Sequence, residues 1–285
     1  MARSSIRLLA VDIDGTLTDP QFKVSDRNIA ALRAAHSAGI EIMLATGRRH
    51  DYALPIAQQL GFPLLLASSN GAIVRSSAGE TYFTDFLPAS TAVKLIHHMD
   101  AFRGCAVLTF DHPSHDALVL ERFDELNRSI SRWLEVNRPY IRYVSPLEAA
   151  VATEDPVQAM FCGPVAHMIQ AQERLAGADF LDEITILRTQ YDHRDLSILD
   201  ILTHNCSKGH ALRRWAGRQA IPQQSIMAIG DNYNDLEMLE FAGLPVLMGN
   251  ASEDLKRNGW QITASNQESG VAVAIEEHLG LAFQS

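Results

Sequence analysis

Two aspartates separated by one residue directly follow the first apolar segment of the chain. The segment reads IRLLAV, and the string DIDGT places Asp12 and Asp14 at its end. Such a pair could hold a hard divalent cation while one carboxylate oxygen remains free to attack an electrophile. Gly15 would permit an unusual backbone turn beside the two acids. An acidic surface turn is the alternative, but this string is rare by chance.

Groups that suit phosphate oxygens follow the second apolar segment, IEIML. The string ATGR places the hydroxyl of Thr46, the backbone amide of Gly47 and the guanidinium of Arg48 in one turn. A TGR turn by itself is more often structural. We interpret it as a phosphate site because its predicted position is beside the two acids.

A lysine and a second acidic string lie in the last third of the chain. Lys208, in SKG, opens a helical segment, where its ammonium could neutralise a phosphoryl group. A lone lysine would otherwise be a solvated surface residue. The string GDNYND follows the apolar segment SIMAI and offers oxygen ligands from Asp231, Asn234 and Asp235. For Asp235, a role at the start of a helix is a real alternative.

Strand-like and helix-like segments alternate at both ends of the chain. Ser25 is a plausible N-cap and Gly39 a plausible stop for a first helix, while Pro55 implies that the next helix starts late or is kinked. Apolar runs such as LLAV, IMLA, IMAI and PVLM lack alternation, which is typical of parallel strands that helices cover on both faces. We therefore expect an α/β fold with a doubly wound, Rossmann-like parallel sheet, whose ligands collect beyond the carboxyl ends of the strands.

The middle of the chain has a different pattern of segments, which indicates an insertion. We expect residues 1–82 and 192–285 to form one discontinuous catalytic core, and residues 83–191 to form an inserted α/β cap domain. Both parts have ordinary domain sizes.

Composition excludes several classes of function. Among 285 residues, 24 Lys and Arg against 34 Asp and Glu give a formal net charge of −10, which disfavours nucleic-acid binding. No apolar run approaches the length that spans a membrane, and no signal peptide is evident, so we expect a cytoplasmic protein. The cysteines at 105, 162 and 206 suggest buried thiols, and the His112/His115 and His97/His98 pairs are weak metal signals.

The four strings, in this order, resemble the haloacid dehalogenase superfamily, and specifically its Cof-type phosphatases, which carry a large cap after the second motif. The resemblance also includes SSNGAI before the cap, and MGNASEDLK and SNQESGVAVAIEEH near the end. The chain departs from the family pattern in THNC, before the lysine, and in RNGWQ. These departures concern loop geometry.

The resemblance implies a role for each matching residue. Asp12 would be the nucleophile that forms an aspartyl-phosphate, and Asp14 would act as general acid and then general base. Thr46 and Lys208 would hold the phosphoryl oxygens. Mg²⁺ would be bound by Asp12, the backbone carbonyl of Asp14 and Asp231, with Asp235 acting on a metal-bound water. The implied substrate-binding residues are Gly15, Gly47, Arg48, Asn70, Gly71 and Asn234.

The resulting prediction is a Mg²⁺-dependent phosphatase of small phosphorylated metabolites, such as phosphosugars or phosphorylated cofactors, acting as a monomer or homodimer. A phosphomutase with the same intermediate and a non-catalytic regulator that binds phosphometabolites remain alternatives. The cap should choose the leaving group. By position, the residues that could do so are Arg188, Tyr191, His193 and Arg194.

Overall fold

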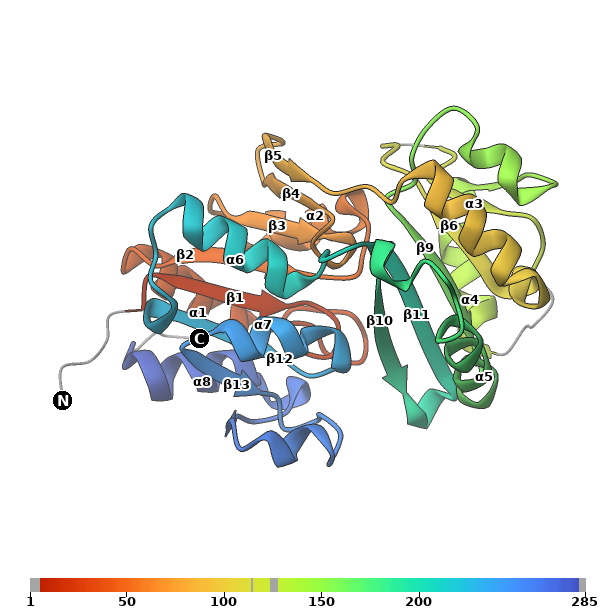
Figure 1. The fold of residues 1–285 in the computed structure, drawn as a ribbon. Coiled ribbons are helices and arrows are strands. Elements are labelled where there is room, and N and C mark those ends of the chain that lie inside the picture. Colours follow the sequence, from red (N-terminus) through yellow and green to blue (C-terminus); the bar gives the residue numbers. More distant parts are fainter. Residues whose placement is uncertain (1–5, 114, 124–127, 282–285) are drawn as a thin grey trace. The chain divides into compact units, whose positions relative to one another are not determined.

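The computed structural model describes residues 6–113, 115–123 and 128–281. The chain divides into two compact units, one formed by Met1–Thr84 with Ser207–Ser285 and the other by Asp85–Cys206 (Figure 1). The second unit extends beyond residue 191, where we expected the core to resume. The reason is that β10 (Ile184–Tyr191) forms an antiparallel hairpin with β11 (Leu196–Thr203), which also pairs with β9 (Gln158–Gly163).

The first unit contains one eight-stranded sheet, in the order β14-β13-β12-β1-β2-β3-β4-β5. Six of these strands are parallel: β1 (Leu8–Asp12), β2 (Glu41–Ala45), β3 (Leu65–Ser68), β12 (Ile226–Gly230), β13 (Leu244–Leu247) and β14 (Gln261–Ile262). An antiparallel hairpin, β4 (Ile73–Ser76) with β5 (Thr81–Thr84), ends the sheet on one side.

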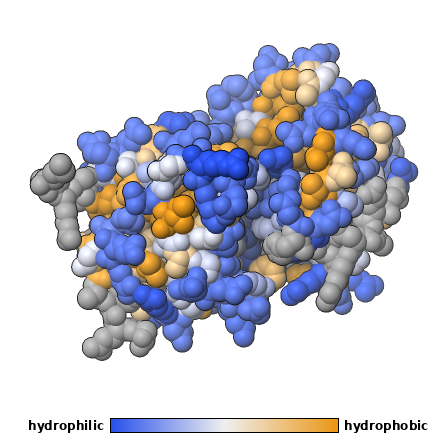
Figure 2. Space-filling view, turned by 90° about the horizontal axis from the view of Figure 1, so that it is seen from below, coloured by the Kyte–Doolittle hydropathy of each residue, from blue (hydrophilic) through white to orange (hydrophobic). Residues whose placement is uncertain are grey.

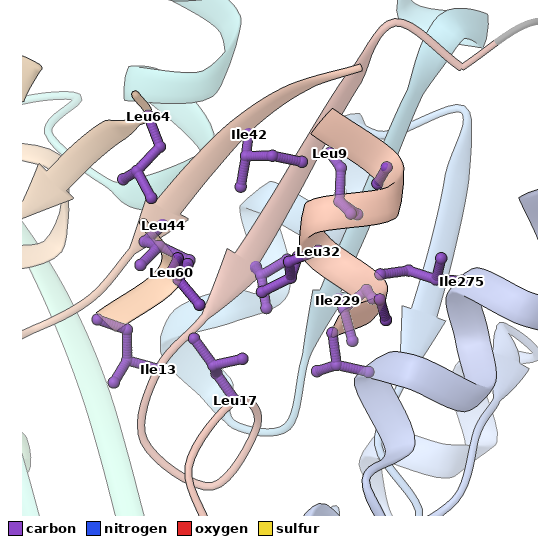
Figure 3. Packing of buried hydrophobic residues seen from close by; sticks show 14 of the residues in the cluster. Leu9, Ile13, Leu17, Leu32, Ile42, Leu44, Leu60, Leu64, Ile229 and Ile275 are labelled. Carbon is purple, nitrogen blue, oxygen red and sulfur yellow. The ribbon is translucent and has the colours of Figure 1, made fainter. Parts of the chain in front are cut away.

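Helices cover both faces of this sheet, as the apolar runs predict. Along β1, Leu9 and Val11 belong to one buried cluster, and Leu8 and Ala10 belong to another. The first cluster, shown in Figure 3, includes side chains of α1 (Asp26–Ser37), α2 (His50–Leu60) and α8 (Gly270–Leu279). The second includes side chains of α6 (Lys208–Arg218) and α7 (Leu236–Phe241). The doubly wound architecture is therefore confirmed.

The predicted ends of the first helix are confirmed. The Ser25 side chain accepts a hydrogen bond from the Asn28 N–H, and Gly39, just beyond the helix, has φ +85°. Of the two alternatives for α2, a late start is wrong, because the helix begins at His50 and contains Pro55 within it. A kink at Pro55 stays a prediction.

The second unit contains a six-stranded sheet, in the order β10-β11-β9-β6-β7-β8, and is antiparallel except where β7 pairs with β8. The remaining strands are β6 (Ala106–Thr109), β7 (Leu118–Leu120) and β8 (Ile141–Tyr143). Helices α3 (Ala89–His98) and α5 (Val165–Leu175) share one buried cluster with the sheet, and α4 (Arg128–Asn137) packs on a separate cluster over β6 and β7. This unit has the α/β character predicted for the insert.

Hydrophilic residues cover most of the face seen in Figure 2, and hydrophobic residues form separate patches on it. None of the helices in the described residues combines the length and the apolar character that crossing a membrane requires. The three cysteines are buried, and none of them forms a disulfide in the described part of the structure.

Candidate active site

The carboxyl ends of four parallel strands bring the predicted chemical groups together. Asp12 is the last residue of β1, Thr46 follows β2, and Asp231 follows β12. The short 3-10 helix Ser69–Gly71, which contains Asn70, follows β3. Parallel pairing in register, with Asp12 beside Ala45 of β2, forces these ends to the same edge of the sheet.

Three buried carboxylates and one buried ammonium form the centre of the site. Oxygens of Asp12, Asp231 and Asp235 lie within 4.8 Å of one another. The Nζ of Lys208, which is 1% exposed, donates to Asp12 Oδ1 at 2.6 Å and to Asp235 Oδ1 at 2.7 Å. Lys208 therefore joins two of the three acids by charge-assisted hydrogen bonds.

Burial and mutual repulsion shift the proton affinities of these groups. Desolvation, and after it the charge of Asp235, raises the pKa of Asp12 to about 7. Desolvation, with Asp12 and Asp235 nearby, also raises the pKa of Asp231 well above its usual value. Burial alone would lower the pKa of Lys208, but Asp12 and Asp235 outweigh it and raise that pKa. Without a further cation, the site holds more negative charge than Lys208 can balance.

Asp231 and Asp235 are held by their own loop and by the turn after β1. The Thr16 hydroxyl donates to Asp231 Oδ1 at 3.1 Å. Asp235 Oδ2 accepts from the backbone N–H groups of Asp231 at 3.0 Å and Asn232 at 3.1 Å. Asp235 thus has the helix-start role that the sequence allows and, at the same time, lies in the acidic cluster.

Gly15 lies against Asp231 at a position that only glycine fits. Its φ is +84°, and a Cβ atom there would be 2.4 Å from Asp231 Oδ2. A side chain at residue 15 would displace that carboxylate.

The turns after β2 and β3 are bonded to each other. Asn70 donates its backbone N–H to the Thr46 carbonyl at 2.8 Å, and Arg48 donates its backbone N–H to Thr46 Oγ1 at 3.1 Å. Asn234 Nδ2 donates to Asn70 Oδ1 at 3.0 Å. A Cβ atom at Gly47 would lie 3.3 Å from the same Asn70 oxygen. Four of the predicted substrate-binding and catalytic residues therefore form one connected group with Asn234.

Gly71 places the start of α6 next to this group. A Cβ atom on Gly71, whose φ is +94°, would lie 2.4 Å from the Ser207 carbonyl oxygen. Ser207 is the N-cap of α6 and accepts from the His210 N–H. The close approach fixes the segment that carries Lys208.

Arg48 contacts the second aspartate of DIDGT. Its Nε donates to Asp14 Oδ2 at 2.7 Å and its Nη2 to Asp14 Oδ1 at 2.6 Å. Burial opposes the charge of Arg48, but the Asp14 hydrogen bonds outweigh it and raise the guanidinium pKa. Contact between Arg48 and a phosphate stays a prediction, because in this structure the guanidinium is bonded to the neighbouring acid.

The candidates for choosing the leaving group lie in the second unit. Arg188 and Tyr191 are on β10, and Arg194 lies in the 3-10 helix Asp192–Arg194, with its guanidinium 5.3 Å from the centre of the Tyr191 ring. The side chain of His193 lies outside the described part of the structure. Their role in specificity stays a prediction.

Sequence reasoning missed Asn250. Its Nδ2 donates to the Gly15 carbonyl at 2.8 Å and lies 3.4 Å from Asp231 Oδ2, while its Oδ1 accepts from the Asn266 N–H at 2.9 Å. The only signal was its place in MGNASEDLK, a string that belongs to the resemblance but suggests no chemistry by itself.

The donor set fits a hard divalent cation. Asp12 Oδ2 is buried and has no hydrogen-bond partner among the described residues, although Lys208 occupies the other oxygen of the same carboxylate. Clustered carboxylate oxygens with raised proton affinity suit Mg²⁺, which prefers oxygen ligands and would relieve their repulsion.

Comparison with known proteins agrees with this geometry. The sequence pattern of the haloacid dehalogenase-like hydrolase family matches residues 9–275. Phosphatase YwpJ of Bacillus subtilis is 30% identical, over 94% of this chain and 98% of its own, and pyridoxal phosphate phosphatase YbhA of Escherichia coli is 29% identical, over 96% and 98%. A haloacid dehalogenase-like hydrolase from Bacteroides thetaiotaomicron has a similar solved structure, with a TM-score of 0.77 and 27% identity over 96% of this chain and 99% of its own.

Proposed function

The chain belongs to the haloacid dehalogenase-like hydrolases and is a Cof-type phosphatase, a phosphoric monoester hydrolase; on that premise we propose that it removes phosphate from small phosphorylated metabolites with Mg²⁺, through an aspartyl-phosphate. One observation carries the proposal. The Asp12 carboxylate lies close to those of Asp231 and Asp235, and it has one oxygen bonded to Lys208 and a second, buried oxygen without a hydrogen-bond partner among the described residues. This carboxylate is the group that would react.

In the first step, an Asp12 carboxylate oxygen forms a bond to phosphorus while the bond from phosphorus to the leaving oxygen breaks. Asp14, two residues further along the chain, gives a proton to the departing alcohol. In the second step, Asp14 takes a proton from water, the water oxygen bonds to phosphorus, and the Asp12–phosphorus link breaks. The products are the alcohol and inorganic phosphate.

Other residues hold the phosphoryl group and balance its charge. Lys208 and the Thr46 hydroxyl would bind phosphoryl oxygens, and the Gly47 turn would supply backbone amides. Asp12, the Asp14 carbonyl and Asp231 would hold Mg²⁺, with Asp235 near its water shell. When bound, the ion supplies positive charge where the phosphate dianion and the three carboxylates meet. Before substrate binds, the carboxylates of Asp12 and Asp235 raise the pKa of Lys208 and stabilise its charged form.

We propose phosphosugars and phosphorylated cofactors as the substrate class. The name of the E. coli relative, pyridoxal phosphate phosphatase, supports the second group. The proposal includes a cytoplasmic location, with which three buried cysteines outside any described disulfide agree. It also includes a monomer or homodimer with no nucleic-acid partner.

Release of inorganic phosphate from a panel of phosphosugars, nucleotides and phosphorylated cofactors tests this function. We expect turnover with Mg²⁺ that stops with EDTA and in Asp12→Asn. The matched control is Asp26→Asn, an exposed acid in the first turn of α1, which should keep wild-type rates. Isomerised phosphosugar without phosphate release would instead indicate a phosphomutase. Binding of an ester without any turnover would indicate a regulator.

A further inference from the structure

Two aromatic rings lie close to the guanidinium that pairs with Asp14. The Arg48 Cζ atom lies 4.9 Å from the centre of the Tyr52 ring and 5.8 Å from that of the Phe22 ring. Both distances are within the range of cation–π attraction. The rings come from different elements, since Tyr52 is in the first turn of α2 and Phe22 is in the loop between β1 and α1.

Both rings are among the exposed large hydrophobic side chains of the chain. Phe22 is 43% exposed and Tyr52 is 41% exposed. Neither ring belongs to a hydrophobic cluster of the described residues, and both rings lie within reach of the Arg48 guanidinium.

The loop that presents Phe22 is tightly organised. Asp19 Oδ1 accepts from the N–H groups of Gln21 at 2.8 Å and Lys23 at 2.9 Å, and the Asp19 carbonyl accepts from the Phe22 N–H at 2.9 Å. Phe22 itself has φ +62°, a backbone conformation that costs energy for a residue with a bulky side chain. The loop thus maintains an unfavourable conformation that presents an aromatic ring toward Arg48.

We propose that Phe22 and Tyr52 form an aromatic clamp that holds Arg48 on Asp14 and thereby positions the acid–base group of the reaction; this inference rests on the proposed function. Cation–π attraction uses the faces of the rings and leaves the Arg48 N–H groups available for the bidentate pair with Asp14. The bidentate pair fixes the plane of the Asp14 carboxylate, so the orientation of this carboxylate toward the reacting oxygens depends on Arg48. Phe22 and Tyr52 are positioning residues, because they act through Arg48.

The clamp has a consequence that a merely structural role does not have. In an alkyl phosphate the leaving group is a poor one, and its oxygen needs a proton from Asp14 in order to depart. In p-nitrophenyl phosphate the leaving group is a good one, and it departs as the phenolate without that proton. Loosening the clamp should therefore slow the first reaction more than the second.

The experiment compares kcat and KM for glycerol phosphate and p-nitrophenyl phosphate in the double variant Phe22→Leu/Tyr52→Leu. We expect kcat/KM, which reports the first step because both esters form the same aspartyl-phosphate, to fall about tenfold more for the alkyl ester than for the aryl ester. The ring-conserving variants Phe22→Tyr and Tyr52→Phe should keep the wild-type ratio. The matched control is Tyr143→Leu, which removes a 62% exposed ring from the second unit and should also leave the ratio unchanged.

The possible outcomes separate the clamp from the proposed function. Equal losses of kcat/KM for both esters, or no loss of kcat/KM, in an active and folded double variant would overturn the clamp and leave the phosphatase function standing. A wild-type protein that releases phosphate from neither ester would overturn both. The NMR signal of the Arg48 Nε–H gives a second reading, because it should become mobile in the double variant and stay rigid in the ring-conserving ones.

Discussion

Single residues at the centre of the site are arranged for chemistry at the expense of stability. Asp12, Asp231 and Asp235 are all buried, and Lys208 bonds to Asp12 and to Asp235. Burying like charges together costs free energy unless a counter-charge is present. Such a cost in free energy is expected at a site that binds a metal ion and a phosphate group.

Replacing Asp12 with Asn should therefore stabilise the metal-free protein at neutral and higher pH. The pKa of Asp12 rises from 3.8 to about 7 on folding, so its contribution to the free energy of unfolding decreases as pH rises from about 4 to 7 and stays low above that. Asn removes this loss. The gain should be on the order of a few kcal/mol at pH 8 and much smaller at pH 5.

Urea unfolding in EDTA at the two pH values measures this difference. Asp26→Asn, which changes an exposed acid, should show no comparable gain at pH 8. A metal-free Asp12→Asn protein that is less stable than the wild type at pH 8 would show that the bond from Lys208 outweighs burial and repulsion.

At the scale of elements, the sequence predicts the groups that follow buried strands and misses those in loops. Asp12, Thr46 and Asp231 each adjoin an apolar strand, and parallel pairing leaves them one possible edge. Phe22 and Asn250 lie in loops whose paths depend on hydrogen bonds and contacts to distant segments. The bond from Asn250 to Gly15 joins residues 235 positions apart, which no local pattern encodes.

The loop after β13 should tune metal affinity through Asn250. Its amide bonds to the Gly15 carbonyl and lies beside Asp231, so Asn250→Ala would free both the turn and the proposed ligand. We expect Mg²⁺ affinity, measured by calorimetric titration without substrate, to fall about tenfold, as is usual for residues that orient metal ligands. Asn258→Ala, which removes an amide that bonds to the Leu255 carbonyl, is the control and should leave the affinity unchanged. Unchanged affinity in Asn250→Ala would restrict this residue to a structural role.

For the whole molecule, the alternation of strand-like and helix-like segments predicted the doubly wound sheet. It did not show at which residue the chain returns from the second unit to the first. The segment after residue 191 is apolar, like a core strand, yet it forms β11 of the second sheet. A hairpin between two eight-residue strands depends on pairing between them, and apolar runs alone do not reveal which sheet a strand joins. The two units consequently have separate hydrophobic clusters, each complete within its own sheet and helices.

Separate cores predict separate responses to ligand and to mutation. All three clustered acids belong to the first unit, so saturating Mg²⁺ should raise the unfolding temperature of that unit by roughly 5–10 °C and leave the other transition in place. Arg103→Met should lower the unfolding temperature of the second unit and leave that of the first unchanged. Arg103 bonds Asp100 at 2.6 Å and Glu121 at 2.9 Å, and it also pairs with Glu148, within the second unit. Scanning calorimetry of the full chain, with Mg²⁺ or EDTA, distinguishes the two transitions. If Mg²⁺ shifted both transitions equally, the two units would unfold as one cooperative body, and the separate cores would not define its stability.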